Sequence, residues 1–157
     1  MVIFVRRADM TEWNPMKLLG LLAFLVVALA AAASAAATPG IVEFRTPSGN
    51  IGCIYASAFQ SFPASVRCDI RSGLKPKPGQ PKNCHLNYGD SFTLPKTGRA
   101  VVTCHGDTTL DPHAPVLGYG KTWRRNGFTC TSKAIGLRCT NASGHGFFMS
   151  RAHSYRF

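Results

Sequence analysis

The sequence predicts a small all-β domain that disulfide bonds staple together, and three observations lead to this expectation. After Ala37, no stretch sustains the i, i+3, i+4, i+7 apolar spacing of an amphipathic helix, whereas short apolar runs bounded by Gly, Pro, Asn and Ser recur. Eight Phe, four Tyr and one Trp follow the same residue and can fill a modest core. All six cysteines lie there as well. We therefore expect a sheet of hairpins arranged as a sandwich or a partial barrel.

The N-terminal segment has the pattern of a secretory signal. Residues 18–37 are apolar at every position except one serine, follow a lysine, and end in small residues that suit signal peptidase. We predict a signal peptide over residues 1–37, with cleavage after Ala37 and a natural start at Met16. An uncleaved membrane anchor is the alternative, since a bilayer span needs about 20 apolar residues. We favour cleavage, which makes residues 38–157 a single secreted domain, extracellular or associated with the cell wall, with no membrane span.

Eight short segments have the composition of strands and are separated by turn-forming residues. In chain order they are 41–45, 51–56, 65–70, 91–94, 100–103, 127–132, 137–140 and 147–150. Between the third and the fourth of these segments, residues 71–83 contain three prolines and three lysines. Proline lacks the amide donor that a sheet needs, so this part is expected to be an extended loop between hairpins.

The cysteines are expected to form disulfides rather than a metal or redox site, because an even number of them follows an export signal. In the clearest hairpin, Phe128 and Cys130 alternate with threonines, and a turn over 133–136 would bring Cys130 opposite Cys139. Sequential pairing then gives Cys53–Cys68, Cys84–Cys104 and Cys130–Cys139. Six cysteines allow many other connectivities, and the sequence favours this one without excluding them.

Seven strings of residues, spread over most of the chain after the signal, occur together in a recognisable order. They are FRTPSGNIGC at 44–53, RCDI at 67–70, CHGD at 104–107, VLGYGKTW at 116–123, GFTCTS at 127–132, GLRC at 136–139 and SGHGFFMSR at 143–151. Together with the six cysteines, they resemble a family of small secreted actinobacterial proteins of unknown function. The resemblance implies export, disulfides and a compact single domain, and it brings no catalytic assignment.

Two segments carry histidines that could transfer protons. His105-Gly106-Asp107 places an imidazole close to a carboxylate, and His145 lies between two glycines just before an apolar segment. The candidate catalytic residues are therefore His105, Asp107 and His145. The same segments are also ordinary turn sequences, because Gly-Asp favours turns and Asp side chains bond to nearby backbone. We favour the turn interpretation for both segments.

No cofactor or metal ion is expected. The histidines lack the short His-x-His spacing of zinc ligands, and the sequence contains no Cys-x-x-Cys pair. Glu43 is the only glutamate after Ala37, which argues against a glycosidase that uses paired carboxylates. The sequence also lacks a nucleophile elbow, a phosphate-binding loop and a dinucleotide-binding fingerprint.

Positive charge is the remaining signal. Fifteen basic and five acidic residues follow Ala37, which gives a net charge of +10. Lys121, Arg124 and Arg125 flank Trp123, and a surface that combines cations with an aromatic ring can hold anionic polymers. The alternative is that the charge serves solubility and that Trp123 belongs to the core. The sequence does not decide between these two interpretations.

Three functions remain open. The first, which we favour, is a non-enzymatic, monomeric module that associates with anionic cell-wall or surface polymers through a basic face. The second is a small secreted ribonuclease or other phosphodiesterase, in which His105, Asp107 and His145 act on a phosphate together with a cation near Trp123. Nucleic acid is thus a second, weaker candidate partner. The third is a protease inhibitor or other protein-binding module that uses the loop over 71–83.

Overall fold

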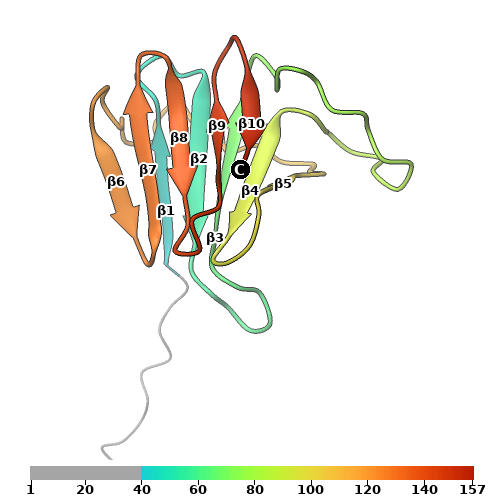
Figure 1. Ribbon diagram of the computed structural model, residues 1–157, viewed down its shortest axis with the longest axis horizontal. Helices are drawn as coiled ribbons and strands as arrows, with labels where there is room; N and C mark the ends of the chain where they lie inside the picture. Colours follow the sequence, from blue (N-terminus) through green and yellow to red (C-terminus); the bar gives the residue numbers. More distant parts are fainter. Residues whose placement is uncertain (1–39) are drawn as a thin grey trace, which may run out of the picture. The chain divides into compact units, whose positions relative to one another are not determined.

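The computed structural model describes residues 40–157, and every regular element in this range is a β-strand (Figure 1). The first sheet contains β1 (Ile41–Arg45), β2 (Ile51–Ala56), β3 (Ser65–Ile70), β4 (Ser91–Pro95) and β5 (Val101–Val102). The second contains β6 (Thr122–Arg125), β7 (Phe128–Lys133), β8 (Gly136–Thr140), β9 (Gly146–Met149) and β10 (Ser154–Arg156). The predicted signal peptide over 1–37 lies outside the described residues. Within 40–157, no helix is long and apolar enough to cross a membrane.

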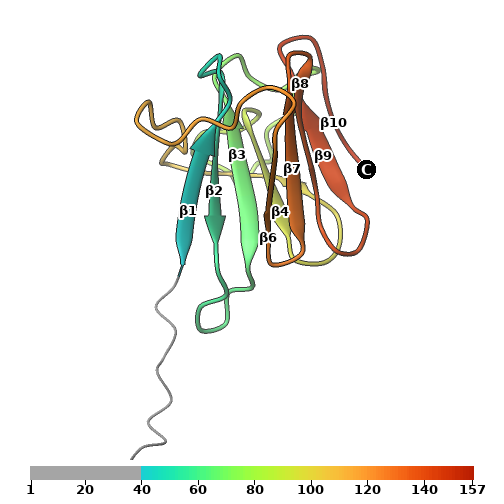
Figure 2. The ribbon, with the colours of Figure 1, turned by 90° about the vertical axis from the view of Figure 1, so that its left-hand side faces the viewer.

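Each sheet is an antiparallel meander in which strands that follow one another in the chain are neighbours. Figure 2 shows β1, β2 and β3 in one layer and β7, β8 and β9 in the other. Aromatic side chains meet between the layers. The ring centroids of Phe92 and Phe147 are 5.5 Å apart, and those of Tyr55 and Phe128 are 5.9 Å apart. The predicted all-β class is confirmed, and the two facing sheets form a sandwich.

All eight expected strands are present, and each end agrees with the prediction to within one residue. β6 and β10 lie outside the eight segments expected from the sequence. β6 pairs with β7 through a turn at Asn126-Gly127, where both residues have positive φ, 47° and 86°. Asn-Gly with this backbone is the strongest short signal for a hairpin, but two adjacent arginines in β6 obscure the apolar alternation. β10 has only three residues, too few to show a period.

The disulfides follow the sequential pairing that the sequence favours. Cys53 faces Cys68 across β2 and β3, and Cys130 faces Cys139 across β7 and β8, each pair with a Cα–Cα distance of 4.1 Å. The third disulfide, Cys84–Cys104, joins the loop before β4 to the segment after β5. Three disulfides in one small domain are consistent with an extracellular protein.

The long connection between β5 and β6, residues 103–121, returns across the first sheet. Its backbone contacts β1, where Arg45 N donates to Pro115 O at 2.9 Å. Closer to its start, Thr109 Oγ1 donates to the Gly52 carbonyl of β2 at 2.7 Å. A Cβ on Gly52 would lie 2.2 Å from the Thr109 backbone oxygen, a distance that no side chain tolerates. The absence of a side chain at this position therefore lets the connection lie directly on the sheet.

We expect Gly52→Ala to destabilise the domain by about 1–3 kcal/mol, because the added methyl group must push the connection away from β2 or distort the strand. Urea unfolding followed by tryptophan fluorescence measures this change. Gly79→Ala is the matched control, since a Cβ there meets no atom within 4 Å. Equal urea midpoints for the two variants would show that the connection does not rest on Gly52.

Candidate functional site

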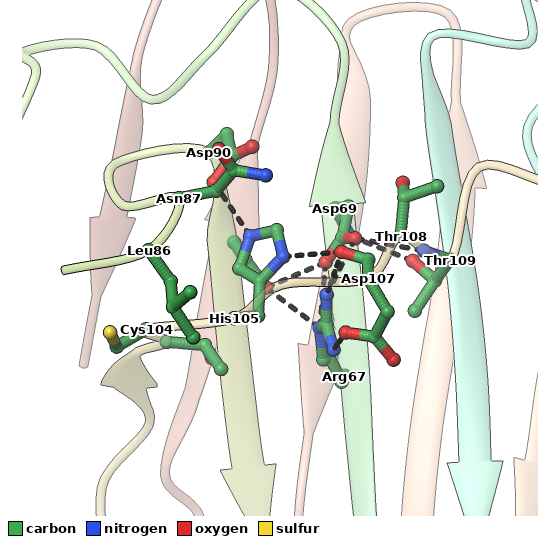
Figure 3. Close-up of polar contacts among 12 residues, drawn as sticks. Arg67, Asp69, Leu86, Asn87, Asp90, Cys104, His105, Asp107, Thr108 and Thr109 are labelled. Carbon is green, nitrogen blue, oxygen red and sulfur yellow. Dashed lines mark hydrogen bonds and ion pairs between the residues drawn. The ribbon is translucent and has the colours of Figure 1, made fainter. Parts of the chain in front are cut away.

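The candidate residues His105 and Asp107 belong to a polar network on the outer face of the first sheet (Figure 3). β3 turns Val66 and Cys68 toward the core, so Arg67 and Asp69 point to the opposite face. The connection that follows β5 covers this face. The site is therefore built from β3, the start of β4 and the first part of the connection.

Asp69 is the centre of the network, and its carboxylate is 1% exposed. Arg67 Nε and Nη2 donate to its two oxygens, each at 2.9 Å. Ser91 Oγ donates at 2.6 Å and the Thr109 amide at 2.8 Å. Burial alone would raise the pKa of Asp69, but the hydrogen bonds from Arg67, Ser91 and Thr109 outweigh it and hold the pKa below its ordinary value. The carboxylate is thus ionised and fully used by protein donors.

Arg67 connects Asp69 to Asp107. Its Nη1 donates to the Asp107 carboxylate at 2.7 Å, and its Nη2 donates to the Asp107 carbonyl at 3.1 Å. Burial would lower the pKa of Arg67, but the bonds to Asp69 and Asp107 raise it instead, so the guanidinium stays charged. The bond from Arg67 likewise lowers the pKa of Asp107, although that carboxylate is 79% exposed. Asp107 therefore caps an arginine rather than orienting the histidine with its carboxylate.

His105 is buried, and both of its ring nitrogens are occupied. Nε2 lies 2.9 Å from Asp90 Oδ1, and Nδ1 lies 2.5 Å from the Asp107 backbone carbonyl (Figure 3). Both contacts are therefore to oxygen atoms that only accept hydrogen bonds. This arrangement ties the start of β4 to the connection. It leaves no ring nitrogen free to exchange a proton with a substrate.

The third candidate, His145, lies elsewhere, in the turn between β8 and β9. In that turn Asn141 Oδ1 accepts from the His145 amide at 3.1 Å, while Asn141 Nδ2 donates to Pro95 O at 2.9 Å. Pro95 ends β4, whereas Asp90, the partner of His105, immediately precedes that strand. At about 3.3 Å per residue, these two positions are roughly 16 Å apart along the strand. The structure brings His105 and Asp107 together and does not bring His145 to them.

The predicted basic cluster lies on the edge strand β6 and just before it. Lys121, Arg124 and Arg125 are exposed. Trp123 is partly buried, and its ring lies 5.2 Å from that of Phe44 in the other sheet. Trp123 therefore closes one edge of the sandwich, and its three basic neighbours remain at the surface.

Several contributors to the site were not singled out from the sequence. Arg67 and Asp69 stand in the string RCDI, where alternation predicts that they share a face, but their partner Thr109 is 40 residues away from Asp69. Asp90 lies between two predicted elements, and no motif around it marked it as a partner of His105. Within 40–157, no three His, Cys, Asp or Glu side chains are placed to hold a metal ion. The network holds the connection over 103–121 on the first sheet through ion pairs and hydrogen bonds.

We expect Asp69→Asn to lower the free energy of unfolding at pH 7 by about 3 kcal/mol, because it leaves the largely buried Arg67 cation without its main partner. The depressed pKa of Asp69 stabilises the fold above the ordinary value of 3.8, and this stabilisation is lost as pH falls through the lower folded-state pKa. Urea titrations between pH 7 and pH 2 should therefore show a smaller acid-induced loss for the variant than for the wild type.

Glu43→Gln is the control for this experiment, because Glu43 is exposed and lies outside the network. It removes one carboxylate without touching Arg67. If the Asp69→Asn protein matched the wild type in stability at pH 7, or kept the full acid dependence, the network would not be holding the fold together.

Comparison with known proteins identifies one family. A family model described as a family of unknown function, DUF6636, matches residues 21–157. No curated protein and no solved structure matches the chain. The sequence resemblance to a six-cysteine family without an assigned activity is thereby confirmed.

Proposed function

The chain belongs to this family of unknown function, and we propose that it is a secreted, non-enzymatic module that associates with anionic cell-wall or surface polymers. The observation that carries the proposal is the charge of the second sheet. Residues 112–157 include the whole of β6–β10 and contain seven Lys and Arg residues but no Asp or Glu. A surface with one sign of charge attracts polymers of the opposite sign over a Debye length.

All seven of these cations are exposed. They are Lys121, Arg124, Arg125, Lys133, Arg138, Arg151 and Arg156. The acidic residues lie in the other half of the described chain, where three of the five contact the side chain of Arg67 or His105. The protein therefore offers few carboxylates that could neutralise the second sheet, and its cations are available to an external anion.

The geometry of the histidines supports binding rather than catalysis. Phosphodiester cleavage needs a general base and a general acid that converge on one phosphorus. His105 has both ring nitrogens engaged, and His145 lies near the other end of β4. The basic surface, in contrast, needs no convergent geometry. It needs only cations that remain exposed when the domain folds.

We expect the triple variant Lys121→Gln, Arg124→Gln, Arg125→Gln to bind immobilised poly(glycerol phosphate) roughly 100-fold more weakly than the wild type at low salt. Each cation near an anionic surface contributes about 1 kcal/mol, so three contribute about 3 kcal/mol. Surface plasmon resonance at several NaCl concentrations measures the affinity. Wild-type binding should also fall steeply with salt, and immobilised neutral dextran should retain neither protein.

The matched control is Lys75→Gln, Lys77→Gln, Lys82→Gln, which removes the same charge from the loop over 71–83. Retention of most of the affinity in this control supports a binding face on the second sheet. Equal losses in both triple variants would instead indicate a response to net charge alone. Binding that ignores salt, or degradation of RNA by the purified protein, would contradict the proposed function.

A further inference from the structure

A pocket of about 330 Å³ opens between β5 and β10, the two edge strands at one side of the sandwich. Figure 1 shows these strands and the loop over 71–90 at the same side of the domain. Two prolines of that loop, Pro76 and Pro78, line the pocket together with residues of both sheets. The volume falls in the range of small-molecule sites in proteins.

The pocket has a cationic side. Arg99 and Arg156 both line it, and none of its lining residues is acidic. Arg156 Nη1 donates to the Ala100 carbonyl at 3.2 Å, which holds one end of the guanidinium and leaves its other donors unused by the described residues. Arg99 makes no side-chain hydrogen bond within 40–157, so its planar fork is free. A guanidinium group binds carboxylate or phosphate oxygens in bidentate geometry.

The remaining wall is apolar and aromatic. Phe92, Leu74, Val102 and the two prolines line this part of the pocket. Ser154 also lines the pocket, and its buried hydroxyl makes no hydrogen bond with the described residues. The site thus combines an oxyanion-binding side with a surface suited to the C–H face of a ring.

Backbone contacts hold the pocket in shape. The Ser154 amide of β10 donates to the Lys75 carbonyl at 2.6 Å, so the proline loop covers the free edge of the second sheet. Leu74 is buried beneath it, and the Cys84–Cys104 disulfide anchors the other end of the loop. The loop over 71–83 is therefore attached at both ends, and two of its three prolines line the pocket.

We propose that this pocket binds one acidic sugar unit, a pyranose that carries a carboxylate or a phosphate. Arg99 and Arg156 hold the anionic group, while Pro76 and Pro78 contact the ring. The choice of a sugar rests on the proposed association with surface polymers, but the pocket and its arginines do not depend on the cations near β6. The second sheet attracts the polymer, and the pocket distinguishes its repeating unit.

The test is a titration of the purified, disulfide-bonded protein followed by ¹H–¹⁵N correlation spectra. Glucuronic acid, glucose 6-phosphate and glucose are added in separate arms at matched ionic strength. We expect saturable shifts at the amides of Arg99, Tyr155 and Arg156 with one or both anionic sugars, and none with glucose. The arm that saturates at the lower concentration identifies whether the recognised group is a carboxylate or a phosphate.

Arg99→Gln should weaken this binding roughly 10-fold or more, because it removes a charge-assisted hydrogen bond. Arg99 is exposed and makes no side-chain bond to the described residues, so the variant should fold. Lys96→Gln, which removes the same charge from an exposed position outside the pocket lining, should leave the binding unchanged. An absence of saturable shifts, equal shifts with glucose, or unchanged affinity in Arg99→Gln would overturn the proposal. These outcomes are independent of polymer retention by the second sheet, so the two proposals fail separately.

Discussion

Asp69 is a carboxylate placed on the outer face of a sheet and then covered by the chain itself. Its donors come from three segments, namely Arg67 on β3, Ser91 on β4 and the Thr109 amide in the connection after β5. Burying an ionised group is costly unless hydrogen bonds and an opposite charge compensate for it. The carboxylate is stable only when all three segments are in place, so it makes their arrangement cooperative.

The attachment of the connection to the first sheet also affects the second sheet. Among the described residues, the connection over 103–121 is the only covalent path from the first meander to the second. It approaches β2 so closely that Gly52 has no room for a side chain, and it reaches β6 after bonding to β1. The start of the second sheet therefore depends on how the connection lies on the first. Residues that looked like catalytic candidates, His105 and Asp107, contribute to this attachment.

The distribution of charge follows from the way the acids are used. Three carboxylates contact Arg67 or His105 on or next to the first sheet, while residues 112–157 contain no carboxylate side chain. Exposed cations add little to folding stability, so the fold does not require seven of them on and next to one sheet. Solubility alone is served equally well by a surface of mixed sign. Neither folding nor solubility requires this one-sided charge, which is the observation behind the proposed association with an external anion.

The sequence predicted the local features of this domain and missed those that depend on distant partners. Alternation in β7 and β8 was enough to place Cys130 opposite Cys139, because both lie within one hairpin. The Asn126-Gly127 turn is also a local signal, because Asn-Gly indicates a hairpin and therefore a strand on its N-terminal side. In contrast, the pairing of Asp69 with Thr109 depends on a connection that crosses the sheet. No periodicity within either segment contains that information.

The two edges of the sandwich show why one side of the domain carries a pocket. At one edge, Trp123 from β6 packs against Phe44 and Tyr55, and this aromatic cluster fills the space between the sheets. At the other edge, the covering element is a proline-rich loop, which can supply a carbonyl to Ser154 but few amide donors of its own. Such a loop protects the edge strand from pairing with another chain without filling the gap beneath it. The space that remains, lined by arginines and without a carboxylate, is suited to an anion.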